Sequence, residues 1–175
     1  IVAFPTETVY GIGVNIFDEE AIKKIFMAKG RSFEKPLPAM VSSVEEVESL
    51  VEEINETARR IMNKYWPGPL TLIFKKKADV SLGSKEDTIA IRIPDHPITL
   101  ALLKACQVPL AVTSANISGD PDTKSAAAVE KEIGDKIDLI IDGGPSPIGV
   151  PSTVLDVTET IPRVLRQGSV IVAVS

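Results

Sequence analysis

Short apolar runs alternate with capped amphipathic segments along this chain, and this alternation limits the fold more than any other feature of the sequence. Strands are predicted where apolar and β-branched residues cluster or alternate between turn residues. The predicted strands cover residues 1–5, 70–75, 89–93, 109–113, 137–142, 153–157, 163–165 and 170–174, and an extended stretch covers 37–41.

The helical segments carry start and stop signals. Asp18 can cap a helix over 18–29 that Gly30 ends, and Ser43 forms a capping box with Glu46 ahead of a second helix. Asn55 can cap a third helix, which must stop before the Trp-Pro-Gly-Pro sequence at 66–69. Two further helices are predicted over 97–106 and 125–133.

Helices placed between strands indicate a layered α/β domain. Several connections are too short for a helical crossover, so part of the strand pairing must be antiparallel. A length of 175 residues fits one domain that covers residues 1–175. Because the sequence opens on an apolar strand, we expect an N-terminus that is trimmed or partly disordered.

Composition excludes several classes of protein. Nineteen basic against 24 acidic residues give a net charge of -5, which argues against a surface that coats nucleic acid. One cysteine, Cys106, and one histidine, His96, exclude an internal disulfide and a Cys/His zinc cluster. Cys106 is expected to pack in the core. No apolar run approaches the roughly 20 residues of a membrane span and no signal peptide is evident, so we expect a cytoplasmic protein without membrane contact.

Six turns beside predicted strands share a polar character. Each combines small hydroxyl residues with glycine or proline, and often with a cation. Hydroxyls and free backbone N–H groups suit phosphate or carboxylate oxygens, and arginine adds a bidentate contact. Any single turn is explained as well by capping or by a surface ion pair, but six together favour an anion site. The turns span 6–13, 29–37, 88–94, 113–119, 149–156 and 165–168, with the cations Arg31, Lys35, Arg92 and Arg166.

Common signatures of nucleotide binding and nucleophilic catalysis are absent from the sequence. There is no GxxxxGK(S/T) loop and no G-x-S-x-G elbow, and the glycines at 11 and 13 lack the third glycine of a dinucleotide fingerprint. His96 precedes Pro97, where a turn or a helix start is the favoured role. The sequence therefore offers no apparatus for nucleophilic catalysis.

Seven segments in order resemble the YrdC-like, threonylcarbamoyl-AMP synthase family: PTETVYGIG at 5–13, KGRSFEKPL at 29–37, WPGPLTLIF at 66–74, AIRIPDHP at 90–97, TSANISG at 113–119, PSTVLD at 151–156 and LRQG at 165–168. The resemblance covers nearly the whole chain. It implies a twisted, mixed and largely antiparallel open α/β sheet with helices packed on it and a large concave basin. It also implies a nucleotidyltransferase that makes threonylcarbamoyl-AMP and pyrophosphate from L-threonine, bicarbonate and ATP, the first step of tRNA threonylcarbamoyladenosine modification.

The resemblance further assigns roles to matching positions. Threonine would be bound by Thr8, Arg92, the backbone around Val112, and Ser152. ATP would be bound by Lys29, Arg31, Lys35, Thr88, Ser114, Asn116 and Arg166, and catalysis would rest on Arg31, Lys35, Ser114 and Asn116. Mg²⁺ would be held by the ATP phosphates and water, with no metal site made by protein side chains alone.

Two positions depart from the family pattern. Met40 stands near the place of a histidine that helps to hold threonine in some members, and a thioether cannot donate that hydrogen bond. Pro151 stands where an acidic residue is common. The chain ends at Ser175 without the C-terminal domain of two-domain members, so the single-domain form is expected.

Three other functions remain open on the sequence. A YrdC-like module could bind tRNA or double-stranded RNA by shape without synthase activity, although the negative net charge argues against it. A related carbamoyl transferase would need zinc-finger and acylphosphatase-like modules that this sequence lacks, and a paralogue could have kept the fold and lost the activity. The expected partners of the synthase are ATP, L-threonine, bicarbonate, a downstream tRNA threonylcarbamoyl transferase and weakly bound tRNA or double-stranded RNA.

Overall fold

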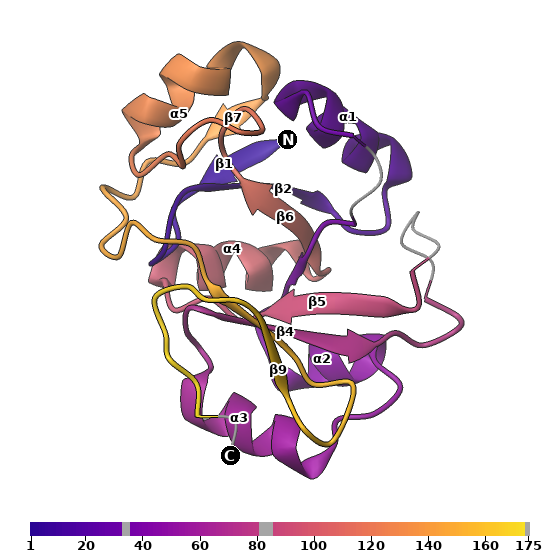
Figure 1. Ribbon diagram of the computed structural model, residues 1–175. Coiled ribbons are helices and arrows are strands. Elements are labelled where there is room, and N and C mark those ends of the chain that lie inside the picture. The colour runs from indigo at the N-terminus through magenta and orange to yellow at the C-terminus, as the bar shows by residue number, and fades with distance from the viewer. Residues whose placement is uncertain (33–35, 81–85, 174–175) are drawn as a thin grey trace.

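The computed structural model describes residues 1–32, 36–80 and 86–173. They form one mixed sheet in the order β7-β1-β2-β6-β3-β5-β4-β8-β9 (Figure 1). Five neighbouring pairs are antiparallel, and the pairs β1/β7, β3/β5 and β4/β8 are parallel, so the predicted fold class is confirmed. The strands are β1 (Val2–Phe4), β2 (Gly11–Asn15), β3 (Ala39–Met40), β4 (Leu70–Lys75), β5 (Thr88–Arg92), β6 (Leu110–Ser114), β7 (Leu139–Ile140), β8 (Thr153–Asp156) and β9 (Arg163–Arg166).

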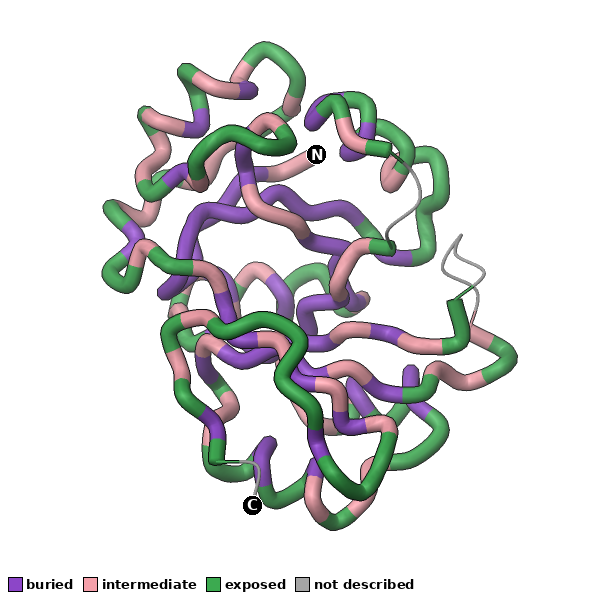
Figure 2. Tube along the Cα trace, in the orientation of Figure 1, coloured by how far each residue is buried: buried purple, intermediate pink, exposed green. Residues whose placement is uncertain are grey.

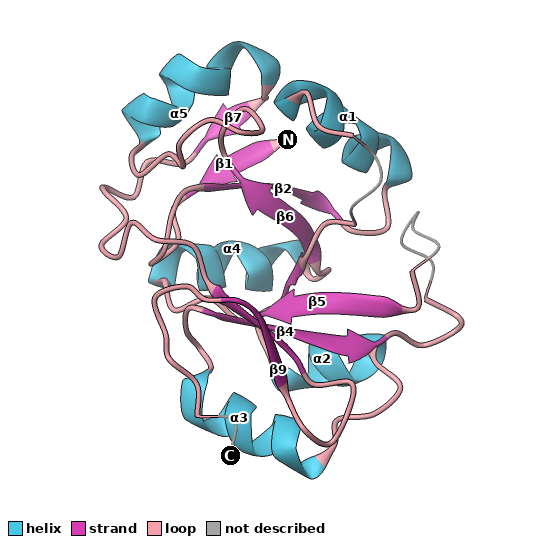
Figure 3. Cartoon of the chain, viewed as in Figure 1, coloured by secondary structure: helices cyan, strands magenta, loops and turns pink. Residues whose placement is uncertain are grey.

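The helices begin where the sequence places their caps (Figure 3). The Asp18 carboxylate accepts the Ala21 N–H at 3.0 Å, and Gly30 ends the first helix with a left-handed φ of 59°. The predicted capping box at the second helix and the cap at the third are also confirmed. The helices are α1 (Glu19–Lys29), α2 (Val44–Leu50), α3 (Glu56–Tyr65), α4 (Pro97–Cys106) and α5 (Ala126–Ile133), followed by the 3-10 helix η1 (Gly134–Lys136).

The helices pack around the sheet in two groups. In Figure 1, α1 and α5 lie by β1, β2 and β7, whereas α2 and α3 lie by β4 and β9. Apolar side chains of these four helices share one buried core with the sheet. A second cluster joins Leu103 of α4 to Phe4, Leu110 and Val112, so α4 supports the central strands, which are the most buried part of the chain (Figure 2).

The strand β2 is not predicted from the sequence, because two glycines interrupt its apolar pattern. Both glycines have a packing reason. A Cβ on Gly13 would lie 2.9 Å from a ring carbon of Phe4, and a Cβ on Gly11 would lie 3.0 Å from a methyl group of Val112. The glycines therefore allow large side chains of neighbouring strands to approach the backbone closely.

Three local predictions are wrong. The strand predicted over 137–142 is limited to β7, whose only strand partner within the described ranges is the three-residue β1. The described part of 170–174 forms no strand, because the Val170 carbonyl accepts the Thr153 hydroxyl at 2.6 Å and the Gln167 amide at 2.7 Å. Cys106 is exposed, since it is the last residue of α4 and precedes the left-handed Gln107. Among the described residues, no helix is long and apolar enough to cross a membrane.

Candidate active site

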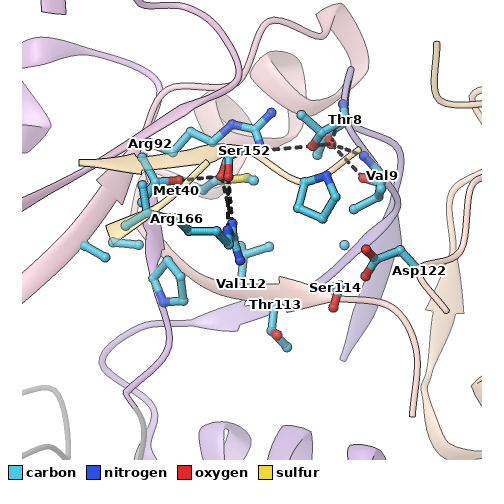
Figure 4. Close-up of a pocket in the computed structure, with 18 of the residues that line it drawn as sticks. Thr8, Val9, Met40, Arg92, Val112, Thr113, Ser114, Asp122, Ser152 and Arg166 are labelled. Carbon is cyan, nitrogen blue, oxygen red and sulfur yellow. Dashed lines mark hydrogen bonds between the residues drawn. The ribbon is translucent and has the colours of Figure 1, made fainter. Parts of the chain in front are cut away.

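A pocket of about 430 Å³ lies between the two halves of the sheet (Figure 4). The two residues of β3 pair with β6 on one side and with β5 on the other, and both line the pocket. Thr8 and Ser114 line it from the half of the sheet that contains β2 and β6, and Arg92, Ser152 and Arg166 line it from the half that contains β5, β8 and β9. The volume falls within the range of small-molecule binding sites.

The pocket brings together predicted residues that are far apart in the sequence. Arg92, Ser114 and Arg166 are the last residues of β5, β6 and β9, and Ser152 immediately precedes β8. The predicted anion-binding turns therefore meet at one place, as the sequence indicated. The predicted site residues that line the pocket are Thr8, Arg31, Arg92, Val112, Ser114, Ser152 and Arg166.

The turn before β2 is fixed by threonine hydroxyls. Thr6 donates its hydroxyl to the Val9 carbonyl at 2.6 Å and accepts the N–H groups of Thr8 and Val9 at 3.2 Å. Because the Thr6 proton is committed, the 2.9 Å contact between the two hydroxyls has Thr8 as the donor. The Thr8 oxygen also accepts Nη1 of Arg92 at 3.0 Å and keeps its remaining acceptor capacity for a ligand.

Arg92 is buried and its guanidinium is held by three groups. Nε donates to the Gly68 carbonyl at 3.2 Å, Nη1 donates to Thr8, and Nη2 forms an ion pair with the Glu7 carboxylate. The other carboxylate oxygen of Glu7 accepts the Asp95 N–H. Burial, together with the charge of Arg166, lowers the pKa of Arg92 to about 9. Arg92 thus stays cationic at neutral pH, but Glu7 offsets much of its charge.

Arg166 reaches the pocket from β9 and is bound to the backbone instead of to an acid. Nε and Nη2 donate to the Ser152 carbonyl at 3.1 and 2.9 Å, and Nη2 also donates to the Ser152 hydroxyl at 3.3 Å. That hydroxyl lies 2.8 Å from Oγ1 of Thr71. Partial burial lowers the pKa of Arg166. Among the described residues, no carboxylate forms an ion pair with this arginine.

Lys29 is buried beneath the segment that follows β6. Its ammonium donates to the carbonyls of Ser114 and Asn116 at 2.5 and 2.6 Å and to Oδ1 of Asn116 at 3.3 Å. Desolvation, with a smaller contribution from the charge of Arg31, lowers the pKa of Lys29 to about 8. Asn116 uses its own amide to donate to the Ile117 and Asp120 carbonyls. Lys29 and Asn116 therefore form an internal network that shapes the turn carrying Ser114.

Arg31 follows the C-terminus of α1 and lines the pocket. Its guanidinium carbon lies 5.6 Å from the Phe26 ring centroid, and Nη1 lies 3.4 Å from the Thr113 hydroxyl. Burial lowers the pKa of Arg31. These weak contacts hold the side chain against the wall and leave much of its donor capacity for an anion.

Not every predicted residue lines the pocket. Lys29 and Asn116 lie behind the wall, and Thr88 lies at the start of β5, at the end opposite Arg92. Lys35 falls outside the described residues. Met40 contributes to the lining, and His96 is the N-cap of α4, as its position before a proline indicated.

Three residues near the ligand space were not expected from the sequence. Glu7 had a visible signal, because it is the only acid in the otherwise apolar and hydroxyl-rich segment 1–14. Thr71 reads as an ordinary β-branched strand residue, and Asp122 as part of a polar loop, so neither carries a signal of its own. Both line the pocket.

The oxygen atoms that line the pocket suit a metal ion only when oxygen atoms of a bound ligand complete its coordination. No group of three His, Cys, Asp or Glu side chains that could hold a metal ion occurs in the described part of the chain. The lining does include the Asp122 carboxylate and the hydroxyls of Thr113 and Ser114. Such oxygens fit Mg²⁺ when phosphate oxygens and water complete its coordination.

The chain is similar in sequence and in fold to known proteins. A protein-family model for Sua5, YciO and YrdC, described as "Telomere recombination", matches residues 1–168. A threonylcarbamoyl-AMP synthase of Pyrococcus abyssi is 48% identical over 170 residues, which cover 96% of this chain and 50% of that protein. A threonylcarbamoyl-AMP synthase of Bacillus subtilis is 43% identical over 173 residues, covering 97% and 50%.

A solved structure extends the similarity to the fold. The crystal structure of P. abyssi Sua5 complexed with L-threonine superposes with a TM-score of 0.91 at 48% identity, covering 95% of this chain and 50% of that one. The chain therefore spans about half the length of the curated relatives that it matches.

Proposed function

This chain belongs to the Sua5, YciO and YrdC family, and from that premise we propose that it is a threonylcarbamoyl-AMP synthase domain. The proposed reaction converts L-threonine, bicarbonate and ATP into threonylcarbamoyl-AMP and pyrophosphate, which makes the protein a nucleotidyltransferase. The names of the curated relatives and the L-threonine complex of P. abyssi Sua5 support this assignment.

The observation that carries the proposal is the convergence of separate turns on one pocket. Thr8, Arg31, Arg92, Ser114 and Arg166 come from five segments of the chain and all line the same cavity. A cavity lined by several cations and hydroxyls can hold an amino acid and a triphosphate side by side. If these five residues lay on separate faces of the protein, they could not bind both substrates, and the proposed activity would have no site.

The reaction asks the protein for positioning and for charge stabilisation. The threonine amine bonds to the carbon of bicarbonate, one C–O bond of bicarbonate breaks, and its oxygen leaves as water with a proton from the amine, which gives a carbamate. A carbamate oxygen then bonds to the α-phosphorus of ATP. The bond from that phosphorus to the bridging oxygen breaks, and pyrophosphate leaves with the electron pair. No protein nucleophile is required, in agreement with a site made of cations and hydroxyls.

We assign the amino-acid end to the buried part of the pocket. The free acceptor capacity of Thr8 suits an N–H group of threonine, and the guanidinium of Arg92, held by Glu7, suits the carboxylate. Val112 and Ser152 border the same space. A dry environment at this end would also protect the unstable carbamate from hydrolysis.

We assign the phosphates to Arg31, Arg166 and Ser114, with Lys35 as a further ATP ligand. Thr88, outside the pocket lining at the far end of β5, stays an ATP ligand on the family resemblance alone. Lys29 and Asn116 act here by shaping the turn that presents Ser114. Mg²⁺ would arrive with ATP and offset phosphate charge, and the Asp122 carboxylate and the Ser114 hydroxyl are the pocket oxygens available to it.

The direct test is formation of the acyl-adenylate. The protein would be incubated with ATP, L-threonine, Mg²⁺ and isotopically labelled bicarbonate, and the products analysed by mass spectrometry. We expect labelled threonylcarbamoyl-AMP together with pyrophosphate, each dependent on all of the substrates. A folded protein that forms no bicarbonate-dependent adenylate would refute the proposal.

The downstream partner would be a transferase that moves the threonylcarbamoyl group to tRNA. Because this chemistry needs ATP and tRNA, the proposed location is the cytoplasm. An RNA-binding module without synthase activity is the competing function. The net charge of -5 does not favour it, because phosphate contacts supply most non-specific nucleic-acid affinity. Filter binding of tRNA at physiological salt, run beside the adenylate assay, separates the two functions.

A further inference from the structure

Two buried hydroxyls form a pair on the floor of the pocket. Oγ1 of Thr71 lies 2.8 Å from Oγ of Ser152, and the two residues are 5% and 6% exposed. Both line the cavity. Among the described residues, Thr71 has no other side-chain hydrogen bond, and Ser152 Oγ has only Arg166 as an additional partner.

The direction of these bonds follows from Arg166. A guanidinium can only donate, so the 3.3 Å contact makes Oγ of Ser152 an acceptor. A hydroxyl that accepts from a cation becomes a stronger donor, and hydrogen bonds in a chain polarise one another. Either hydroxyl can donate in the 2.8 Å contact, and we assign Ser152 as the donor because Arg166 polarises its hydroxyl. With this assignment, the hydroxyl proton of Thr71 is left over at the end of the chain. A buried donor without an acceptor is unfavourable, which predicts an acceptor on the ligand.

The surroundings of Thr71 indicate which acceptor this is. Thr71 of β4 pairs with Val154 of β8 on one side. On the other side, the register of β4 with β5 brings Thr71 beside Arg92 and pairs Ile73 with Ala90, so Thr71, Arg92 and Ala90 share one face of the sheet. Thr71 is thus a neutral donor beside two small apolar side chains that also line the pocket. A ligand carboxylate would be stabilised better by a guanidinium than by this neutral hydroxyl. A ligand side chain that carries one hydroxyl and one methyl group matches a hydroxyl donor between two apolar side chains.

We propose that Thr71 is a further substrate-binding residue, which donates a hydrogen bond to the side-chain hydroxyl of L-threonine while Ala90 and Val154 receive the methyl group. The inference rests on the proposed function, because it takes L-threonine as the ligand. It makes Thr71 a determinant of specificity. A site built to bond a substrate hydroxyl discriminates strongly against an analogue that lacks it.

The test compares the binding of two ligands by calorimetry, in the whole chain and without ATP. L-valine is the isostere of L-threonine in which a methyl group replaces the hydroxyl. In Thr71→Val, affinity for L-threonine should fall roughly ten- to hundredfold, while affinity for L-valine should stay the same or rise. Thr71→Ser keeps the hydroxyl and should retain the preference for L-threonine.

Thr99→Val is the matched control, since Thr99 is a fully buried threonine of α4 that does not line the pocket. It should leave both affinities unchanged, and circular dichroism would verify the fold of every variant. An unchanged affinity of Thr71→Val for L-threonine, or equal losses for both ligands, would overturn the inference. If the unmodified protein does not bind L-threonine at all, it is the proposed function that fails.

Discussion

Replacement of Glu7 by glutamine should destabilise the fold strongly, because it leaves the charge of Arg92 buried without an opposite charge. The side chains of Arg92 and Glu7 are only 7% and 9% exposed. Removal of one partner of a buried ion pair costs about 3–5 kcal/mol. Arg92 would keep its bonds to the Gly68 carbonyl and to Thr8, and glutamine retains one oxygen for the Asp95 N–H. We therefore expect the lower end, about 3 kcal/mol.

Urea unfolding followed by circular dichroism measures this cost. With a denaturant dependence of about 1–3 kcal/mol per molar urea, the midpoint should fall by about 1 M or more. Glu48→Gln is a matched control, because Glu48 pairs with Arg59 at 3.4 Å on the surface and both side chains are half exposed. The control should cost less than about 1 kcal/mol.

A double-mutant cycle decides whether the ion pair is the cause. The free energy of unfolding would be measured for Glu7→Gln, for Arg92→Met and for the double variant. The double variant should lose clearly less stability than the sum of the two single variants, because each single change leaves a group buried without its partner. Strict additivity, or a loss in Glu7→Gln no larger than in Glu48→Gln, would refute this reasoning.

Three further predictions concern other parts of the molecule. Burial lowers the pKa of Lys29 from 10.5 to about 8, so the unfolded chain binds more protons than the folded chain between these pH values. The free energy of unfolding, relative to that of Lys29→Met, should therefore rise with pH in this window. Urea unfolding at several pH values measures this difference, and a difference that falls as the pH rises would contradict the prediction. Gly13→Ala places a methyl group 2.9 Å from the Phe4 ring and should cost about 1–3 kcal/mol by urea unfolding, so an unchanged midpoint would disprove the packing argument. Arg166→Ala should weaken binding of a non-hydrolysable ATP analogue roughly tenfold or more in calorimetry. Arg163 is an exposed arginine of the same strand, and Arg163→Ala should leave this affinity unchanged. Equal losses of affinity in the two variants would show that Arg166 does not bind the phosphates.

The elements that could be predicted from the sequence are those with local signals. Helix starts at Asp18, Ser43 and Asn55 depend on a side chain and a backbone N–H three residues away, and all three are confirmed. The strand β2 depends instead on how Phe4 and Val112 pack against its glycines, which no local pattern reveals. The same distinction explains why the helix ends are predicted better than β7 at one edge of the sheet, which is predicted over 137–142 and observed at Leu139–Ile140.

The site was predictable where a turn combines hydroxyls with a cation, and less so where a role depends on a partner across the sheet. The cations Arg31, Arg92 and Arg166 were singled out from their turns and do line one pocket. Lys29 was expected near the ATP phosphates, but its three short bonds lie within the fold. Thr71 gave no signal, because its position beside Ser152 follows only from the pairing of β4 with β8.

The distribution of charge, more than the number of cations, separates the two ends of the pocket. Arg92 has Glu7 as its counter-ion, so the buried end is nearly neutral and suits an amino acid whose own charges balance. Arg31 and Arg166 make no ion pair with any described residue. Both line the cavity, Arg31 beside Thr113 of β6 and Arg166 from β9. Two such guanidiniums can bind a polyanion between them even in a chain of net charge -5, since a local field decides association with a charged ligand. Under the proposed function, discrimination between threonine and triphosphate would follow from which arginine the fold neutralises.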